Sequence, residues 1–133
     1  MSQIKLNIET KTQKYPIYIG KKVSANMSQI IKSNSIKFNR CLLVVDSNVP
    51  KKFVSMIKKS LKNKMSYIHY FKANELNKNM NSSNKILEIL LNKNFSRDDC
   101  LISIGGGITG DISGFAASPV SYTHLTLPTM LPV

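Results

Sequence analysis

Three consecutive glycines, Gly105, Gly106 and Gly107, are the residues of this 133-residue chain whose spacing best suits chemistry. Residues 100–104 before them form an apolar run typical of a buried strand, and residues 108–117 after them repeat apolar side chains at helical spacing. Glycines between a strand and a helix let backbone N–H groups approach an anion closely. The helix N-terminus adds about half a positive charge. The pattern predicts a cradle for phosphate groups, although a tight strand-to-helix crossover would use the same glycines.

Polar side chains also follow two other strand-like runs. Asp46 and Asn48 come after the apolar residues 41–45, and the polar residues 72–81 follow the run at 67–71. The carboxyl ends of parallel strands share one edge of a sheet, where ligands bind. We therefore expect these residues to lie near the glycines, with Asp46 positioned to accept ribose hydroxyls. The alternative is that Asp46 and Asn48 only end a strand and cap a helix.

The order of elements predicts an α/β fold. Alternating apolar residues at 4–8 and 15–19 indicate an antiparallel hairpin with one buried face. After a helix that we expect at 23–31, strands and helices alternate, which implies right-handed crossovers and a parallel sheet with helices on its faces. We expect Ser82 or Ser83 to cap the helix that precedes residue 100.

Composition excludes several classes of protein. The formal net charge is +12, but the lysines are spread along the chain and are not interleaved with aromatic residues, so we expect no nucleic-acid partner. No apolar run is long enough for a membrane span. Cys41 and Cys100 each begin an apolar run and read as buried free thiols of a cytoplasmic protein. No spacing of Cys and His predicts a zinc site, and His69 within a strand reads as structural.

The last residues differ in character from the rest. From Val120 onward Lys and Asn disappear, and Thr, Leu and Pro take their place. The DNA string GTC TCT TAT ACA CAT CTG ACG CTG CCG ACG encodes residues 120–129 and resembles a transposon-end sequencing adapter. We therefore expect residues 120–133 to be a non-native tail that does not pack as the next strand of the sheet. His124 is excluded as a catalytic candidate on this ground.

The longer string Gly-Gly-Gly-x-x-Gly-Asp-x-x-Gly-Phe-x-Ala from Gly105 to Ala117 resembles the nucleotide-binding signature of the 3-dehydroquinate synthase family. Tyr15-Pro16-Ile17, Asp46-x-Asn48, Glu75-x-x-Lys78 and Arg97-Asp98 also resemble segments of that family. Asn74 stands where the family normally has Gly. The resemblance implies a truncated Rossmann-like NAD-binding domain over residues 1–119, without the family's C-terminal helical metal-binding domain. It implies a cofactor site made of Asp46, Asn48, Glu75, Lys78, Gly105, Gly106, Gly107, Ile108, Gly110 and Asp111.

The resemblance also implies an activity, with no catalytic residue and no metal ligand inside this chain. Members of the family convert 3-deoxy-arabino-heptulosonate 7-phosphate, a sugar phosphate, to 3-dehydroquinate and phosphate in the shikimate pathway. They use NAD and a divalent metal, zinc or cobalt, that we expect only in a full-length, homodimeric protein. Three alternatives stay open: another NAD-dependent sugar phosphate cyclase, a metal-dependent polyol dehydrogenase, or a basic nucleic-acid-binding module. From the residues alone, two alternatives also stay open: Glu75 and Lys78 as a solvated ion pair, and Asp111 as an acid near a helix N-terminus.

Overall fold

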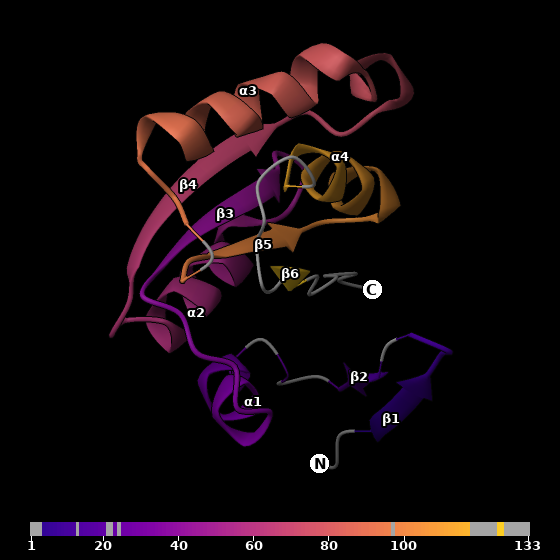
Figure 1. Ribbon diagram of the computed structural model, residues 1–133, viewed down its shortest axis with the longest axis vertical. Helices are drawn as coiled ribbons and strands as arrows, with labels where there is room; N and C mark the ends of the chain where they lie inside the picture. Colours follow the sequence, from indigo (N-terminus) through magenta and orange to yellow (C-terminus); the bar gives the residue numbers. More distant parts are fainter. Residues whose placement is uncertain are drawn as a thin grey trace.

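The computed structural model describes residues 4–12, 14–20, 23, 25–96 and 98–117, and the backbone of residues 125–126. A sheet with helices on both faces forms the main body, and a two-stranded hairpin lies beside it (Figure 1). The predicted α/β fold with a parallel sheet and an N-terminal hairpin is confirmed.

The parallel sheet has the strand order β4-β3-β5-β6. Its strands are β3 (Arg40–Asp46), β4 (Met65–Phe71), β5 (Cys100–Ile104) and the short β6 (Leu125–Thr126). β3 pairs with β4 on one side and with β5 on the other, in parallel. β6 pairs in parallel with β5 over two residues, so these two residues of the tail join the sheet, contrary to expectation. The adapter origin of the tail stays a prediction.

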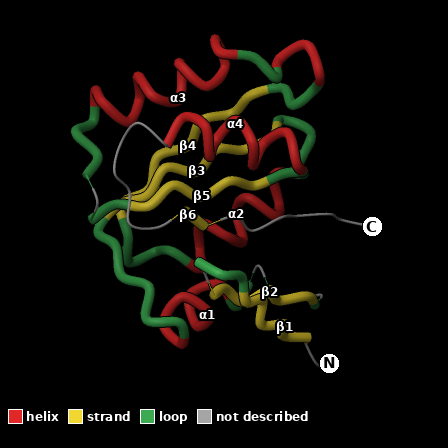
Figure 2. Tube along the Cα trace, turned by 45° about the vertical axis from the view of Figure 1, so that its right-hand side comes forward, coloured by secondary structure: helices red, strands yellow, loops and turns green. Residues whose placement is uncertain are grey.

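Side chains of β3 alternate between two hydrophobic cores. Cys41, Leu43 and Val45 belong to one core, which is completed by residues of α1 (Met27–Ser33) and α2 (Lys51–Ser60). Leu42 and Val44 belong to the other, beneath α3 (Met80–Asn92) and α4 (Gly107–Ala117). All five side chains are fully buried, as expected for a parallel strand covered on both faces. Figure 2 shows the sheet between these two helical layers.

The helices begin at different residues from those expected. α1 starts at Met27. Val23 lies in the preceding turn, where its carbonyl accepts a hydrogen bond from the Asn26 amide at 3.1 Å. α3 starts at Met80 because Asn79, not Ser82 or Ser83, supplies the cap: its side chain accepts a hydrogen bond from the Ser82 amide. None of the helices in the described part of the chain is long and apolar enough to cross a lipid bilayer.

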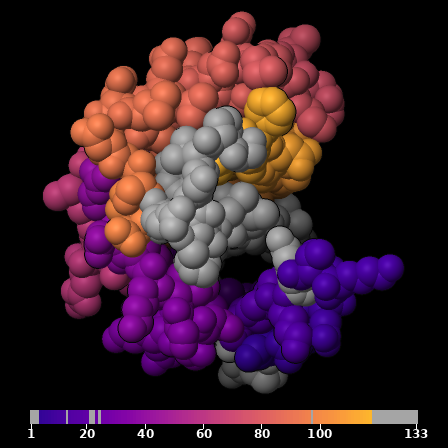
Figure 3. Space-filling view, viewed as in Figure 1, coloured from indigo at the N-terminus to yellow at the C-terminus, as the bar shows by residue number. Residues whose placement is uncertain are grey.

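The hairpin joins β1 (Ile4–Glu9) to β2 (Lys14–Ile19) in antiparallel register. Its apolar side chains do share one face, as predicted, but that face is not buried. The exposed apolar residues on it are Ile4, Leu6, Tyr15, Ile17 and Ile19. The alternation of a strand reports which side chains share a face, but whether another element covers that face depends on the tertiary structure. Figure 3 shows the hairpin, in indigo, projecting beside the region of α1.

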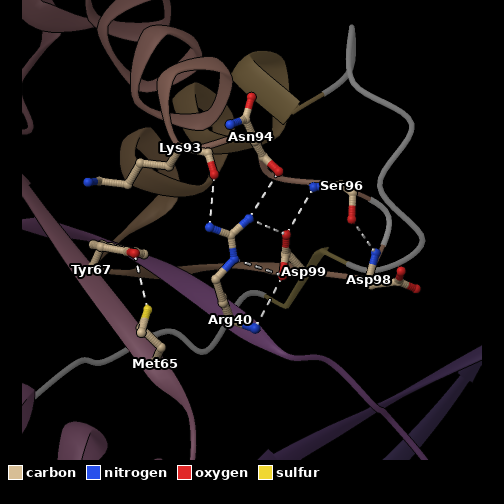
Figure 4. Close-up of polar contacts among 8 residues, drawn as sticks. All are labelled: Arg40, Met65, Tyr67, Lys93, Asn94, Ser96, Asp98 and Asp99. Atoms are coloured by element: carbon tan, nitrogen blue, oxygen red, sulfur yellow. Dashed lines mark hydrogen bonds and ion pairs between the residues drawn. The ribbon is translucent and has the colours of Figure 1, made fainter.

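A buried ion pair ties the amino ends of the strands to the end of α3 (Figure 4). Arg40 Nη2 lies 2.9 Å from Asp99 Oδ2, and Asp99 is only 4% exposed. The same guanidinium donates to the carbonyl oxygens of Lys93 and Asn94 at the C-terminus of α3 and stacks on the Phe95 ring. It therefore neutralises a buried charge and satisfies helix-end carbonyls that have no intrahelical donor.

The backbone after α3 bends sharply to reach this pair. Asn94 has a φ of +54°, and the Phe95 amide donates to the Leu90 carbonyl while the Asn94 amide donates to Leu91. This is a Schellman motif with Asn in the left-handed position, which Asn tolerates better than most residues. The Ser96 amide then donates to Asp99 Oδ2 at 3.0 Å. The turn thus positions the carbonyl oxygens of Lys93 and Asn94, which accept hydrogen bonds from Arg40. It also positions the Ser96 amide, which donates to Asp99 alongside Arg40.

Replacing Arg40 by Met should lower the free energy of unfolding at pH 7 by about 3 kcal/mol, because Asp99 would be left as a buried, unpaired carboxylate. Urea denaturation followed by far-ultraviolet circular dichroism measures this loss. Lys59→Met, on the exposed face of α2, is the matched control and should change stability by less than about 0.5 kcal/mol.

The pH dependence of that loss gives a second readout. Burial raises the pKa of the Asp99 carboxyl, but hydrogen bonds from Arg40 and the Ser96 amide, with the charge of Arg40, outweigh burial and hold the pKa below its ordinary value. This stabilisation is full above the unfolded pKa of about 3.9 and is lost as the pH falls through the lower folded pKa. In Arg40→Met the hydrogen bond and charge of the guanidinium are lost, while the amides of Ser96 and residue 40 still donate to Asp99. The pKa of Asp99 should therefore be higher than in the unmodified chain, and the variant's deficit in stability should shrink as the pH falls from 7 through that raised pKa. A deficit that stays constant would contradict the pairing.

Candidate nucleotide-binding site

Gly105 is required where β5 turns into α4. Its φ is +153°, and a Cβ there would lie 2.5 Å from Thr109 Oγ1 and 3.0 Å from Asp46 Cβ. The absence of a side chain lets the first turn of α4 lie directly against the end of β3. Gly105 thus has a packing role, which also brings the helix N-terminus next to Asp46.

Gly106 and Gly107 face open space. A Cβ on either residue would meet no heavy atom within 4 Å. The Gly110 amide donates to the Gly106 carbonyl at 3.2 Å, so Gly106 caps the helix. The next three amides, of Gly107, Ile108 and Thr109, precede the first intrahelical donor and have no intrahelical acceptor. An anion can therefore approach the positive end of α4 without meeting a side chain on Gly106 or Gly107.

The face of α4 that packs on the sheet is more polar than predicted. Thr109 and Ser113 are fully buried, and neither hydroxyl has a hydrogen-bond partner among the described residues. Ile112 is buried as expected, but Phe115 is 54% exposed. Small side chains face inward because the glycine turn holds α4 close to β5 and β3. Hydrophobic periodicity alone does not predict that Thr109 and Ser113 face the sheet while Phe115 faces outward.

Asp46 organises the turn at the end of β3. Its Oδ1 accepts hydrogen bonds from the Asn48 amide at 3.0 Å and from the Ala73 amide at 3.4 Å. Both bonds go to one oxygen, which leaves Oδ2 available to accept from a ligand. The N-cap of α2 is Pro50, without a side-chain hydrogen bond, so neither Asp46 nor Asn48 caps that helix. Asn48 is exposed.

The loop after β4 reaches across to α4. Lys78 Nζ lies 3.4 Å from Asp111 Oδ2, with both side chains largely exposed. Such a surface pair contributes little to stability, so its main effect is to hold the loop beside the helix. Glu75 begins the 3-10 helix η1 (Glu75–Asn77) with its side chain exposed.

Asn74 explains how this loop forms without a glycine. Its backbone is extended, with φ −151° and ψ 173°, a conformation open to any residue. Its side-chain oxygen accepts a hydrogen bond from the Asn77 amide at 2.9 Å and so caps η1. Asn77 in turn donates to the Lys72 carbonyl. Asparagine is therefore compatible with an ordered loop at this position.

Three predicted segments meet at one edge of the sheet. Asp46 contacts the loop after β4 through Ala73, Lys78 of that loop pairs with Asp111 on α4, and α4 packs through Thr109 beside Gly105. The register places Val45 of β3 opposite Ile104 of β5, so Asp46 and Gly105 follow as neighbours. The sequence-predicted residues thus gather at the carboxyl edge, with Glu75 and Asn48 at its exposed periphery.

The gathered groups fit the phosphates and ribose of a nucleotide better than a metal. Helix amides at an open glycine turn bind phosphate, and a carboxylate at a strand end binds ribose hydroxyls. Within the described ranges, no three His, Cys, Asp or Glu side chains come together as metal ligands. His69 lies in β4 and is partly buried, and burial, with the charge of Lys85, lowers its pKa. A hollow of about 330 Å³ lies elsewhere, lined by Ser28, Phe38 and Lys64 among others.

Sequence comparisons connect the chain to one family. Residues 68–131 match the family described as 3-dehydroquinate synthase N-terminal. The chain is 55% identical over 118 residues to the 3-dehydroquinate synthase of Pelagibacter ubique, a match that covers 89% of this chain and 32% of that protein. It is 37% identical over 122 residues to the same enzyme of Buchnera aphidicola, covering 85% of this chain and 31% of that protein. The chain therefore spans about a third of the length of these relatives.

A solved structure shares the fold. A crystal structure of 2-deoxy-scyllo-inosose synthase complexed with carbaglucose-6-phosphate, NAD⁺ and Co²⁺ superposes with a TM-score of 0.83 at 20% identity. The match covers 95% of this chain and 35% of the other. The resemblance to the 3-dehydroquinate synthase family is confirmed by the sequence matches, and the Rossmann-like fold by the structural one. Arg97, one of the residues that carried the resemblance, lies outside the described residues.

Two glycine substitutions should distinguish a glycine that is needed for helix packing, Gly105, from one that faces open space, Gly107. Gly105→Ala should lower the free energy of unfolding by about 1–3 kcal/mol, because alanine is strained at a φ of +153° and its Cβ meets Thr109. Gly107→Ala, at the first residue of α4, meets nothing and should be neutral or stabilise by up to about 1 kcal/mol. Parallel urea titrations measure both. Equal losses in the two variants would contradict the assigned roles of these glycines.

Proposed function

We propose that this chain, whose relationship to 3-dehydroquinate synthases is the premise, supplies the NAD-binding part of such an enzyme. The observation that carries the proposal is the open N-terminus of α4 at Gly106 and Gly107, joined through Gly105 to the carboxylate of Asp46. An anion-binding helix end beside a ribose-binding acid is the arrangement that a dinucleotide needs.

Each proposed residue has a distinct task. The amides after Gly106 would hold the pyrophosphate, and Gly105 keeps the helix close enough to do so. Oδ2 of Asp46 would accept hydrogen bonds from a ribose hydroxyl, while Oδ1 stays bound to Asn48 and Ala73. Lys78 and Asp111 would hold the loop closed over the cofactor through their ion pair. Glu75, Asn48, Ile108 and Gly110 complete the proposed cofactor site at its edges.

The activity proposed for the full-length protein is 3-dehydroquinate synthase, a lyase of the shikimate pathway that acts on a sugar phosphate. NAD would supply reversible oxidation of a secondary alcohol, which acidifies the neighbouring C–H so that phosphate can leave. The described residues contribute binding and orientation of the nucleotide, with no acid or base group assigned to the reaction. A divalent metal, zinc or cobalt, would be held by residues outside this chain.

A second candidate is another NAD-dependent sugar phosphate cyclase. The structural likeness to 2-deoxy-scyllo-inosose synthase, itself complexed with NAD⁺ and Co²⁺, favours this candidate over a polyol dehydrogenase. The substrate distinguishes the two cyclases: only a 3-dehydroquinate synthase releases phosphate from the heptulosonate phosphate. The 55% identity to the Pelagibacter enzyme supports the first candidate.

The setting of the protein is proposed from the same features. Cys41 and Cys100 are buried and are not joined in a disulfide, which suits a cytoplasmic protein. Burial raises the pKa of the Cys41 thiol to about 12, so that thiol stays protonated. We propose a sugar phosphate as the small-molecule partner and neither nucleic acid nor membrane. Residues 1–119 would form the partial NAD-binding domain, residues 120–133 a non-native tail, and the full-length protein a homodimer.

Gly106→Val tests the cofactor site in the chain itself. A Cβ at this position would meet no heavy atom within 4 Å, so the fold should be kept, but the valine side chain would fill the space that the pyrophosphate needs. We expect NAD to bind the unmodified chain weakly and Gly106→Val at least about tenfold more weakly still. Ligand-observed NMR measures both, with Lys59→Met as the remote control. Equal NAD binding by the variant would contradict the proposed site.

Activity should appear only in the longer protein. The 133-residue chain should release no phosphate from the heptulosonate phosphate, since the expected metal ligands are not among its residues. In a full-length enzyme that carries this sequence, Asp111→Ala should reduce turnover by up to about a hundredfold, because loss of the ion pair with Lys78 would let the loop over the cofactor shift and misplace the cofactor. His69→Gln should alter stability more than turnover. Phosphate release by the chain alone, or normal activity of Asp111→Ala, would refute this assignment.

A further inference from the structure

The two cysteines of the chain lie opposite each other on neighbouring strands. Cys41 is the second residue of β3 and Cys100 is the first residue of β5, and the parallel register pairs them directly. They are the two cysteines that the sequence contains, and they are not joined in a disulfide. Figure 1 shows β3 and β5 side by side. The fold therefore brings both thiols of the chain to one point near the amino edge of the sheet.

Both thiols face the same hydrophobic core. Cys41 and Cys100 are fully buried and belong to the core that α1 and α2 complete. The Cys100 thiol is a weak donor to the Leu101 carbonyl, with 3.7 Å between sulfur and oxygen. The pKa of the Cys41 thiol is raised first by burial and second by the charge of Cys100. The two sulfur atoms are therefore close enough to act as one dithiol group.

The spacing of the strands is too wide for these thiols to form a relaxed disulfide. Neighbouring strands lie about 4.8 Å apart, and side chains of paired residues leave them in nearly parallel directions. Their Cβ atoms are therefore separated by about the same distance, whereas a disulfide favours a Cβ separation of about 3.8 Å. Closing a disulfide would require the two central strands of the sheet to approach each other.

A metal ion between the two sulfur atoms fits the same spacing without moving the strands. A metal–thiolate bond is about 2.3 Å long, so two such bonds in line span about 4.6 Å. Structural zinc requires four ligands, but in the part of the chain that the structure describes no third His, Cys, Asp or Glu joins the pair. Thiolates select soft ions. The geometry therefore suits a soft ion that is satisfied by two sulfur ligands in line.

The charge of the complex favours a divalent ion. Each thiol gives up its proton when it binds a metal, so a monovalent ion such as Ag⁺ would leave one net negative charge in the core. An uncompensated charge in apolar surroundings is costly. Lys64 favours the Cys41 thiolate, but burial outweighs it and raises the pKa of Cys41 to about 12. A divalent ion between two thiolates is neutral and avoids this cost.

We propose that Cys41 and Cys100 form a two-coordinate site for a soft divalent ion, Hg²⁺, between β3 and β5. Two S–H bonds break and two S–Hg bonds form, two protons pass to solvent, and no atom changes its oxidation state. The bound ion would clamp the two central strands together at their amino ends. The site is separate from the glycine turn at the carboxyl edge and does not depend on the proposed function.

Retention of mercury against a competing thiol tests the proposal. The 133-residue chain is incubated for hours with one equivalent of HgCl₂, because a buried site is reached only when the strand ends open transiently. It is then dialysed against excess β-mercaptoethanol and weighed by native mass spectrometry. We expect one mercury per chain with no added thiol. X-ray absorption should show two sulfur neighbours at about 2.3 Å.

A relocated cysteine is the matched control. Ile102 faces the same core, two residues further along β5 and opposite Leu43. The double variant Cys100→Ala, Ile102→Cys keeps two thiols in that core but shifts one by about 6.6 Å along the strand, which is too far for a linear bridge. It should retain mercury at least about tenfold less at the same thiol concentration.

Further measurements separate the folded site from mere chelation by two cysteines. In concentrated urea the unmodified chain and the relocated variant should retain mercury equally, because an unfolded chain does not hold the strand spacing. Cys41→Ala should hold mercury only together with one molecule of the added thiol, which the mass reveals. Far-ultraviolet circular dichroism without urea confirms that each variant is folded.

Three outcomes would overturn the proposal. The first is equal retention of mercury by the folded unmodified chain and the folded relocated variant. The second is mercury in the unmodified chain that carries an added thiol, which would show that one cysteine alone binds it. The third is a circular dichroism spectrum of the mercury-bound chain that has lost the α/β signal, which would show that binding requires the sheet to unfold.

Discussion

Burial of β3 on both faces is the constraint on which the rest of the structure depends. Its five central side chains alternate between two cores, so the strand carries no polar group along its length. Polar chemistry is confined to its ends, with Arg40 at one and Asp46 at the other. The ion pair with Asp99 therefore lies at the amino edge of the sheet, and the candidate nucleotide site at the carboxyl edge. One end of this strand thus contributes to stability, and the other end carries the proposed binding site.

Gly105 is the residue at which these two requirements meet. It lies at the binding edge, yet its contacts with Thr109 and Asp46 are packing contacts. The neighbouring Gly106 and Gly107 face solvent and have no packing role. Three adjacent glycines thus have different roles. Thr109 and Ser113 lie beneath the helix, and their hydroxyls have no hydrogen-bond partner among the described residues, so the close approach of α4 costs hydrogen bonding.

The sequence predicted the strands around residues 41–45 and 100–104 and the glycine turn, because buried parallel strands and glycine turns leave strong local signals. It did not predict that Asn79 would displace Ser82 as a cap, since several residues in one polar loop have capping side chains. Nor did it predict the inward Thr109 and the outward Phe115, which depend on how close α4 lies to the sheet. The exposed face of the hairpin was missed for the same reason: alternation shows that a face is apolar, and tertiary contacts decide whether it is covered.

Pro16 has a consequence for how far association could proceed. An apolar strand with a free edge can act as a template for unlimited growth, as in fibres. Asn7 pairs with Pro16, and because proline has no N–H this is a non-hydrogen-bonded pair, so the backbone of Pro16 faces outward from β2. A strand that added to this edge would leave one of its own backbone carbonyls without a partner, so β2 is a poor template for further chains. A single imino acid thus closes one edge of the hairpin to growth.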